Sequence, residues 1–390
     1  MSRENPDPPR ISDFQITDVG KSKLLFFFMG LINSAGKVFL VNAASDIARL
    51  TGKKSYMAAV SGALVGLSCL IKIFNARYIV RFKHRTRILG AVFFFIMGIL
   101  IILLALSILN FWLALAGCLV VGIGTSLSDT TLQGFMKVFD PRIVVGWSMG
   151  TGLAGLFCST YFNILTSLGV NLYISLSTLF PLYLIYYIGF EVLMKERRSQ
   201  ILLNGFTLED AERREIRDVL TNKQLNMETL PVFWRKMSYY VLNNLVVYFV
   251  VYSMISYQAD IMKEKFNDGF VFRMIINLYQ LGAFIGRASI NYFSIQKLYF
   301  QTFIVMGFYL LWTALALFCQ DFSVYFLYGL IVIIGLTCGS SYGSIIVGIM
   351  RDKNITKQEK EACVNLNSAA SDLGVLCCSA TGILIEKVLY

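Results

Sequence analysis

The sequence has little of the chemistry that soluble enzymes and metalloproteins use. Its 390 residues include one histidine, His84, within the basic segment RFKHRTR, which argues against a histidine metal site or proton relay. Eight cysteines are scattered without a C-x-x-C pair, so buried free thiols are expected. No nucleophile elbow, Walker loop or H-E-x-x-H motif occurs. The sequence therefore predicts no enzyme, no metal and no cofactor.

Charge is also scarce, and long apolar runs take its place. Only 15% of the residues are charged, whereas 56% are hydrophobic. Because a bilayer core requires about 20 apolar residues per spanning helix, the runs predict an all-α, polytopic membrane protein. We expect about eleven transmembrane helices, two of which meet at Leu109 and Asn110. Their predicted ranges are 23–44, 55–76, 88–109, 111–136, 143–165, 172–194, 236–258, 270–293, 298–319, 322–349 and 362–386.

The distribution of basic residues predicts the orientation. Of the 35 Lys and Arg residues, 25 lie in the segments on the side of the N-terminus and six on the opposite side. Basic residues are retained on the cytoplasmic side, so the N-terminus is predicted to be cytoplasmic. The net charge of +11 then reflects topology and attraction to anionic membrane lipids. No nucleic-acid partner is expected.

One hydrophilic insert divides the chain. Residues 1–22 read as a disordered cytoplasmic tail, 23–194 as a six-helix bundle, 195–235 as a cytoplasmic linker and 236–390 as a five-helix bundle. Thr207 begins a capping box for a short helix through Leu220, with i,i+4 pairs Glu209–Arg213 and Asp210–Arg214. This linker is either a solvated connection or a docking site for a cytoplasmic protein. Two pseudo-repeated bundles are typical of secondary transporters.

Residues 150–155, GTGLAG, match the dinucleotide fingerprint G-x-G-x-x-G. That fingerprint requires a preceding strand and an acid about 20 residues later, and here the next acid is Glu191, within an apolar context. Gly146 and Gly150 instead form a G-x-x-x-G pair, which lets membrane helices approach closely. We expect close helix packing, with a substrate-lining role as the alternative.

Six short segments, found in this order along the chain, carry a family resemblance. They are NAASDIA (42–48), LIKIF (70–74), FDPRIVVGWSMGTGLAGL (139–156), LYQLGAFIGRASI (278–290), GSSYGSIIVGI (339–349) and SDLG (371–374). Together they resemble the battenin family of lysosomal and vacuolar membrane proteins. The resemblance implies a major-facilitator-like fold, akin to the equilibrative nucleoside transporters. It also implies a location in the lysosomal or vacuolar membrane, and roles in glycerophosphodiester efflux, basic amino acid balance or organelle pH.

Acids within the predicted spans are the candidates for proton coupling, because a charge facing lipid costs roughly 3 kcal/mol or more. Asp372 lies near the middle of the last span, Asp129 about one turn from the middle of the fourth, and Asp46 at the far end of the first. A structural role as hydrogen-bonded partners is the alternative. Lys37 should face a cavity or an acid, and helical spacing separates it from Asp46.

Two basic residues and two neutral ones are the candidates for substrate binding. Lys72 and Arg287 match family positions and would suit a phosphate or carboxylate, although both could instead extend to the membrane surface. Tyr279 and Gln280 would supply neutral contacts, with ordinary packing the alternative for Tyr279.

Three functions remain open at this point. The leading hypothesis is a secondary transporter for a small anionic or zwitterionic molecule, working by alternating access. The second is a membrane scaffold or trafficking factor that acts through residues 195–235. A membrane-embedded lipid enzyme is the third, and no recognisable catalytic group supports it.

Overall fold

The computed structural model describes residues 19–52, 56–136, 139, 142–203, 226–266, 269–290, 297–318 and 323–389, with scattered positions between 207 and 217. Within these ranges the regular structure is helical and includes no strand. The all-α prediction is therefore confirmed.

The first half of the chain forms the helices that end before the linker. They are α1 (Val19–Leu50), α2 (Met57–Gly66), α3 (Ser68–Arg77), the short 3-10 helix η3 (Ile79–Arg81), α4 (His84–Ser107), α5 (Phe111–Met136), α6 (Ile143–Ser167), α7 (Leu172–Ser177) and α8 (Leu179–Leu203). Helices α2 and α3 together make one span, as do α7 and α8. Pro181 lies in the first turn of α8, where its missing N–H removes no helical hydrogen bond.

The second half begins at α10. Its helices are α10 (Leu230–Ile255), α11 (Tyr257–Phe266), α12 (Gly269–Ser289), α13 (Leu298–Leu317), α14 (Val324–Arg351) and α15 (Lys357–Leu389). Ser323 caps α14 by accepting a hydrogen bond from the backbone N–H of Tyr325 at 3.3 Å. The side chain of Glu359 accepts from the N–H of Thr356 at 3.1 Å, one half of a capping box at the start of α15.

Ten helical segments in the described part of the chain are long and apolar enough to cross a membrane. They match ten of the eleven predicted spans. The remaining prediction, 270–293, corresponds to α12, which has 21 residues, includes Arg273 and Arg287, and is not among the ten. The two predicted spans that meet at Leu109 and Asn110 are separate helices, because α4 ends at Ser107 and Leu109 turns the chain with a φ of 53°.

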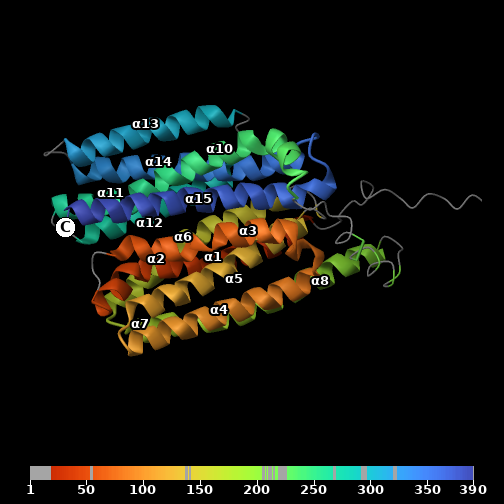
Figure 1. Ribbon diagram of the computed structural model, residues 1–390, viewed down its shortest axis with the longest axis horizontal. Coiled ribbons are helices and arrows are strands. Elements are labelled where there is room, and N and C mark those ends of the chain that lie inside the picture. Colours follow the sequence, from red (N-terminus) through yellow and green to blue (C-terminus); the bar gives the residue numbers. More distant parts are fainter. Residues whose placement is uncertain are drawn as a thin grey trace, which may run out of the picture.

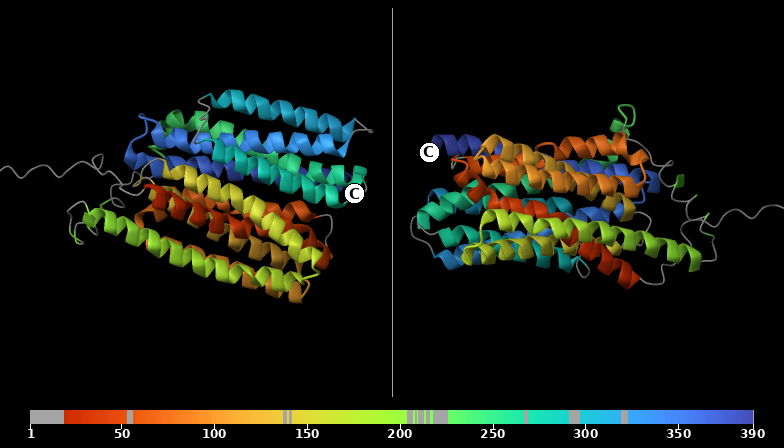
Figure 2. Two further views of the ribbon diagram at one scale, coloured as in Figure 1. Left: turned by 180° about the vertical axis from the view of Figure 1, so that it is seen from behind. Right: turned by 90° about the horizontal axis from the view of Figure 1, so that it is seen from below.

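The two halves of the chain lie side by side. Figures 1 and 2 show α1–α8 grouped together, with α10–α15 beside them. Helix α15 belongs to the second group through α10 and also packs on α2, α3 and α5, while α12 packs on both α14 and α6. These two seams, α15 on α3 and α12 on α6, join the halves.

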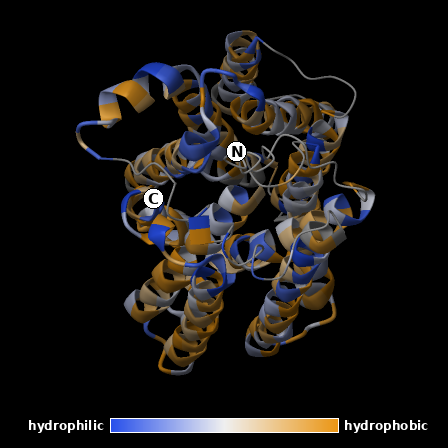
Figure 3. Ribbon diagram, turned by 90° about the vertical axis from the view of Figure 1, so that its right-hand side faces the viewer, coloured by the Kyte–Doolittle hydropathy of each residue, from blue (hydrophilic) through white to orange (hydrophobic). Residues whose placement is uncertain are grey.

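One end of the molecule gathers the turns that the charge pattern assigns to the cytoplasm. The start of α1, the start of α4, the end of α8, the start of α10 and the loop between α14 and α15 meet there, and we call it the basic end. Figure 3 looks onto this end, where hydrophilic residues lie in the turns and the helices are largely hydrophobic. Its cytoplasmic orientation remains a prediction.

The linker is shorter than the sequence suggested. Helix α8 continues to Leu203 and α10 begins at Leu230, so both extend into the predicted range 195–235. The predicted pair of Glu209 and Arg213 is present at 2.6 Å, with both side chains exposed. The Asp210–Arg214 pair and most of the short helix lie outside the described residues.

The glycines of α6 serve close helix packing on two faces. Gly146 and Gly150 abut the backbone of α1 at Lys23 and Phe27, and Gly152 and Gly155 abut α12. This segment is helical throughout, so a nucleotide-binding turn is excluded. A Cβ at Gly150 would overlap the carbonyl oxygen of Phe27, a backbone atom that cannot move aside. Alanine at position 150 would therefore force α1 and α6 apart.

Candidate functional site

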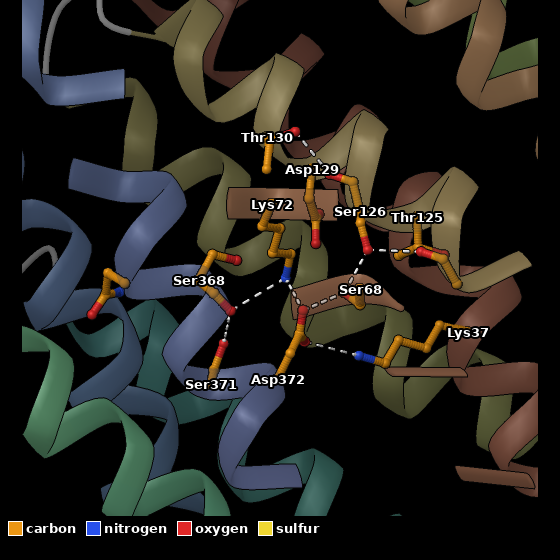
Figure 4. Close-up of polar contacts among 12 residues, drawn as sticks. Lys37, Ser68, Lys72, Thr125, Ser126, Asp129, Thr130, Ser368, Ser371 and Asp372 are labelled. Carbon is orange, nitrogen blue, oxygen red and sulfur yellow. Dashed lines mark hydrogen bonds and ion pairs between the residues drawn. The ribbon is translucent and has the colours of Figure 1, made fainter. Parts of the chain in front are cut away.

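A buried carboxylate in α15 is bound by two lysines of the other half (Figure 4). Asp372 lies near the middle of α15, and its Oδ2 is 2.5 Å from Nζ of Lys72 in α3. Its Oδ1 is 3.7 Å from Nζ of Lys37 in α1. Lys72 also donates to the carbonyl of Ser368 at 3.3 Å. Lys72 and Asp372 are each only 3% exposed, so Lys72 does not extend to the surface.

Two serines complete this centre. Ser68 lies one turn before Lys72 on the same face of α3 and donates to Asp372. Ser126 of α5 donates to Ser68 and lies 2.7 Å from the carbonyl of Gly122. The small side chains let α3 and α5 come together, and Gly122 abuts the backbone of Leu64. The carboxylate of Asp372 therefore has several donors, an arrangement that stabilises a buried charge.

The second acid, Asp129, has a different environment. Its Oδ1 accepts a hydrogen bond from Nδ2 of Asn33 in α1 at 2.5 Å. Asn33 in turn accepts from Ser128, whose hydroxyl lies 2.9 Å from that of Tyr186 in α8. No Lys or Arg among the described residues forms an ion pair with Asp129. The sequence placed both acids in the interior, and the structure shows that only Asp372 has direct cationic partners.

Arg287 lies at the other seam, between α12, α6 and α14. Its Nη1 donates to the hydroxyl of Thr151 at 2.7 Å, and the guanidinium carbon lies 4.6 Å from the centre of the Tyr342 ring. Gly152 provides the space, because a Cβ there would be 3.0 Å from Cδ of Arg287. Within the described part of the chain no carboxylate lies within ion-pair distance of Arg287. Among the described residues, the partners of this interior cation are a hydroxyl group and an aromatic face.

The other predicted site residues, Tyr279, Gln280 and Asp46, lie in three different environments. Tyr279 is buried and its hydroxyl donates to Sγ of Cys338 at 3.3 Å, as the packing alternative proposes. Gln280 lies next to Gly155. It shares one face of α12 with Arg287, which lies two turns further along the helix. Asp46 is bound by Arg49 at 3.2 Å near the end of α1 and does not join the central group.

Sequence reasoning missed a second buried ion pair between the halves. Arg87 of α4 donates to Glu361 of α15 at 2.9 Å, and each side chain is only 1% exposed. Two residues earlier on α15, Glu359 lies 2.8 Å from Nζ of Lys236 in α10. Arg87 and Glu361 each lie one residue outside a predicted span, so the search for charged residues within the spans does not include them. Their position beside the spans was the available signal.

Comparison with known proteins identifies the family. The family model of the CLN3 protein matches residues 24–230 and 222–390. The chain belongs to the CLN3 protein family. Battenin of Dictyostelium discoideum is 24% identical over 381 residues, covering 90% of each chain. Protein BTN1 of Kluyveromyces lactis is 24% identical over 376 residues, covering 95% of this chain and 94% of the relative. The resemblance to the battenin family is confirmed.

Solved structures confirm the fold. A bacterial homologue of the iron transporter ferroportin in an outward-facing state aligns with a TM-score of 0.65 at 11% identity, covering 94% of this chain and 98% of that one. A bacterial homologue of the human lysosomal transporter Spinster, inward-facing and unoccupied, aligns with a TM-score of 0.55 at 14% identity, covering 92% and 80%. The protein is a multi-pass membrane protein with a major-facilitator-like fold.

Proposed function

We propose that this protein is a secondary transporter of the lysosomal or vacuolar membrane that moves a small anionic or zwitterionic molecule, such as a glycerophosphodiester, by alternating access. Membership of the CLN3 protein family and the major-facilitator-like fold support a transporter. Two halves joined through α15 on α3 and α12 on α6 support a rocking movement between them. Effects on organelle pH and on basic amino acid balance would follow from such transport.

The environment of Arg287 is the observation that supports an anionic or zwitterionic substrate. Its charge is not neutralised by a carboxylate of the described residues, and it faces a hydroxyl group and an aromatic ring. An unpaired charge in the membrane interior is unfavourable, so an incoming anion would supply the missing partner. The planar guanidinium can donate two parallel hydrogen bonds to a phosphate or carboxylate. Gln280 would add a neutral contact on the same helix.

The Asp372 centre provides a route to coupling. A proton on Asp372 would remove the negative charge that Lys37 and Lys72 now neutralise. This change would weaken the attachment of α15 to α3 and would release two cations toward an anionic substrate. Asp129 supplies a second protonation site, which lacks an ion-pair partner in the described part of the chain. Both acids are therefore proposed to take part in proton coupling, and Asp46 is proposed to play a lesser part because of its peripheral place.

Uptake into liposomes that contain the purified protein tests this function. We expect saturable uptake of radiolabelled glycerophosphocholine, increased by a pH gradient. Arg287→Lys keeps the charge but loses the planar fork, so phosphodiester uptake should fall more than that of a cationic amino acid. Arg273→Lys, on the exposed part of the same helix, is the matched control and should transport normally. A scaffold that acts through residues 195–235 predicts no flux of any solute.

A further inference from the structure

Three carboxamide side chains are completely enclosed next to the Asp372 centre. Asn75 in α3 and Asn365 in α15 are 0% exposed, and Gln133 in α5 is 2% exposed. Both amide atoms of each asparagine, and Oε1 of Gln133, have no hydrogen-bond partner among the described residues. Buried polar groups without partners are rare, because each costs about 1–3 kcal/mol.

The register of α3 on α15 places the two asparagines opposite each other. These helices run antiparallel: Gly62, in α2 of the same span, abuts Ser379, Ser68 donates to Asp372, and Lys72 donates to the carbonyl of Ser368. Each step along α3 therefore corresponds to an equal step back along α15. Three residues beyond Lys72, the same register pairs Asn75 with Asn365.

The register of the same span on α5 brings in the glutamine. Here the helices run parallel, since Gly122 abuts the carbonyl of Leu64 and Ser126 donates to Ser68. Seven residues further along each helix, the same face carries Asn75 and Gln133. The three carboxamides therefore meet at one level, closer to the basic end than Asp372 is.

This level continues a polar stripe that connects the two buried ion pairs. On α15 the stripe consists of Glu361, Asn365, Ser368 and Asp372, spaced at three and four residues on one helical face. Glu361 is bound by Arg87 at the basic end, and Asp372 is bound by Lys72 and Lys37 in the middle. The carboxamides thus occupy the interval between two charged groups that both join the halves.

We propose that Asn75, Gln133 and Asn365 form a neutral binding site for hydroxyl groups, supplied by ordered water or by the transported solute. Carboxamides both donate and accept, which matches a hydroxyl group and gives no advantage to an ion. A buried water requires two to four polar partners, and this site offers them. Water bound here connects the protonation sites Asp372 and Asp129 with the basic end. This second role rests on the proposed transport function, whereas the binding site itself does not.

Thiol labelling tests the site without any assumption about transport. The purified full-length Asn365→Cys variant is treated with methyl methanethiosulfonate, and peptide mass spectrometry reads the modification of each cysteine separately. The matched control is Val364→Cys, at a neighbouring position that is equally buried among apolar side chains. We expect labelling at position 365 to be several-fold faster than at position 364. Equal labelling at both positions would overturn the proposal.

Transport measurements then identify the source of the hydroxyl groups. Asn365→Leu and Asn75→Leu keep a similar side-chain size, so both variants should still fold, which their melting curves check. Proton-driven uptake should fall by at least about tenfold, the loss expected for one removed hydrogen bond in this setting, and Asn365→Ser should retain it. If the carboxamides bind water, solute exchange at equal pH should persist in the leucine variants. If they bind the solute itself, solute exchange should also fall and the KM for the solute should rise.

Two results separate failure of this inference from failure of the proposed function. Proton-driven uptake at the wild-type rate by Asn365→Leu and Asn75→Leu would overturn this inference and leave the proposed transport function intact. Fast labelling of Asn365→Cys in a protein that transports nothing would retain the hydroxyl site and reject the transport function.

Discussion

Neutralising Asp372 should destabilise the protein more than neutralising any exposed acid. Asp372→Asn leaves the ammonium of Lys72, only 3% exposed, without its partner at 2.5 Å. Removing one member of a buried ion pair costs about 3–5 kcal/mol, because the remaining charge stays in a low-dielectric environment. Lys72→Gln should lower the free energy of unfolding by a similar amount. The double variant Lys72→Gln with Asp372→Asn leaves no mismatched charge between α3 and α15 and should regain part of the stability.

Reversible unfolding in mixed micelles measures these free energies of unfolding. The interaction energy from the double-mutant cycle should be at least about 1 kcal/mol. Asp46→Asn is the matched control, since its pair with Arg49 has side chains that are 28% and 64% exposed, and an exposed pair contributes less than about 1 kcal/mol. Additive losses from Lys72→Gln and Asp372→Asn would refute the argument, and so would equal losses from Asp372→Asn and Asp46→Asn.

Three further predictions concern packing, substrate recognition and topology. Gly150→Ala should lower the unfolding temperature and the yield of folded protein, because its Cβ would overlap the Phe27 carbonyl oxygen; a normal melting curve would contradict the close contact between α1 and α6. Arg287→Lys should raise the KM for a phosphodiester by about tenfold, the effect of losing one charge-assisted hydrogen bond, and unchanged transport would favour a basic amino acid as substrate. Tags at the N-terminus and between residues 204 and 225 should be accessible from the cytosol, and a tag after Tyr390 should be protected in intact vesicles. Cytosolic exposure of the tag at Tyr390 would contradict an odd number of spans.

The sequence predicts the membrane fold well because bilayer thickness and hydropathy determine each span separately. Ten predicted spans match apolar helices in the described residues. The eleventh, α12, shows the limit of this signal, since Arg273 and Arg287 reduce its hydropathy. Its packing against α6 and α14 requires the tertiary structure.

The candidate site is harder to predict, because it depends on the register between helices. Helical spacing shows that Lys37 and Asp46 do not pair, and the structure agrees. No spacing rule pairs Lys72 with Asp372, which lie 300 residues apart in the chain. The same reason explains why Arg87 and Glu361 were missed. The glycine pattern of α6 indicated close packing, but only the structure shows that Gly150 faces α1 whereas Gly152 faces Arg287.

Uptake by purified protein in liposomes tests the central claim most directly. Liposomes that contain the wild-type protein should take up radiolabelled glycerophosphocholine in a saturable way. A proton gradient in one of its two directions across the membrane should drive accumulation of this solute. Under the same conditions Asp372→Asn should lose the accumulation and retain part of the exchange at equal pH. The transporter account would be contradicted if uptake were no faster than in protein-free liposomes. This result would have to hold for phosphodiesters and for basic amino acids, and for either direction of the proton gradient.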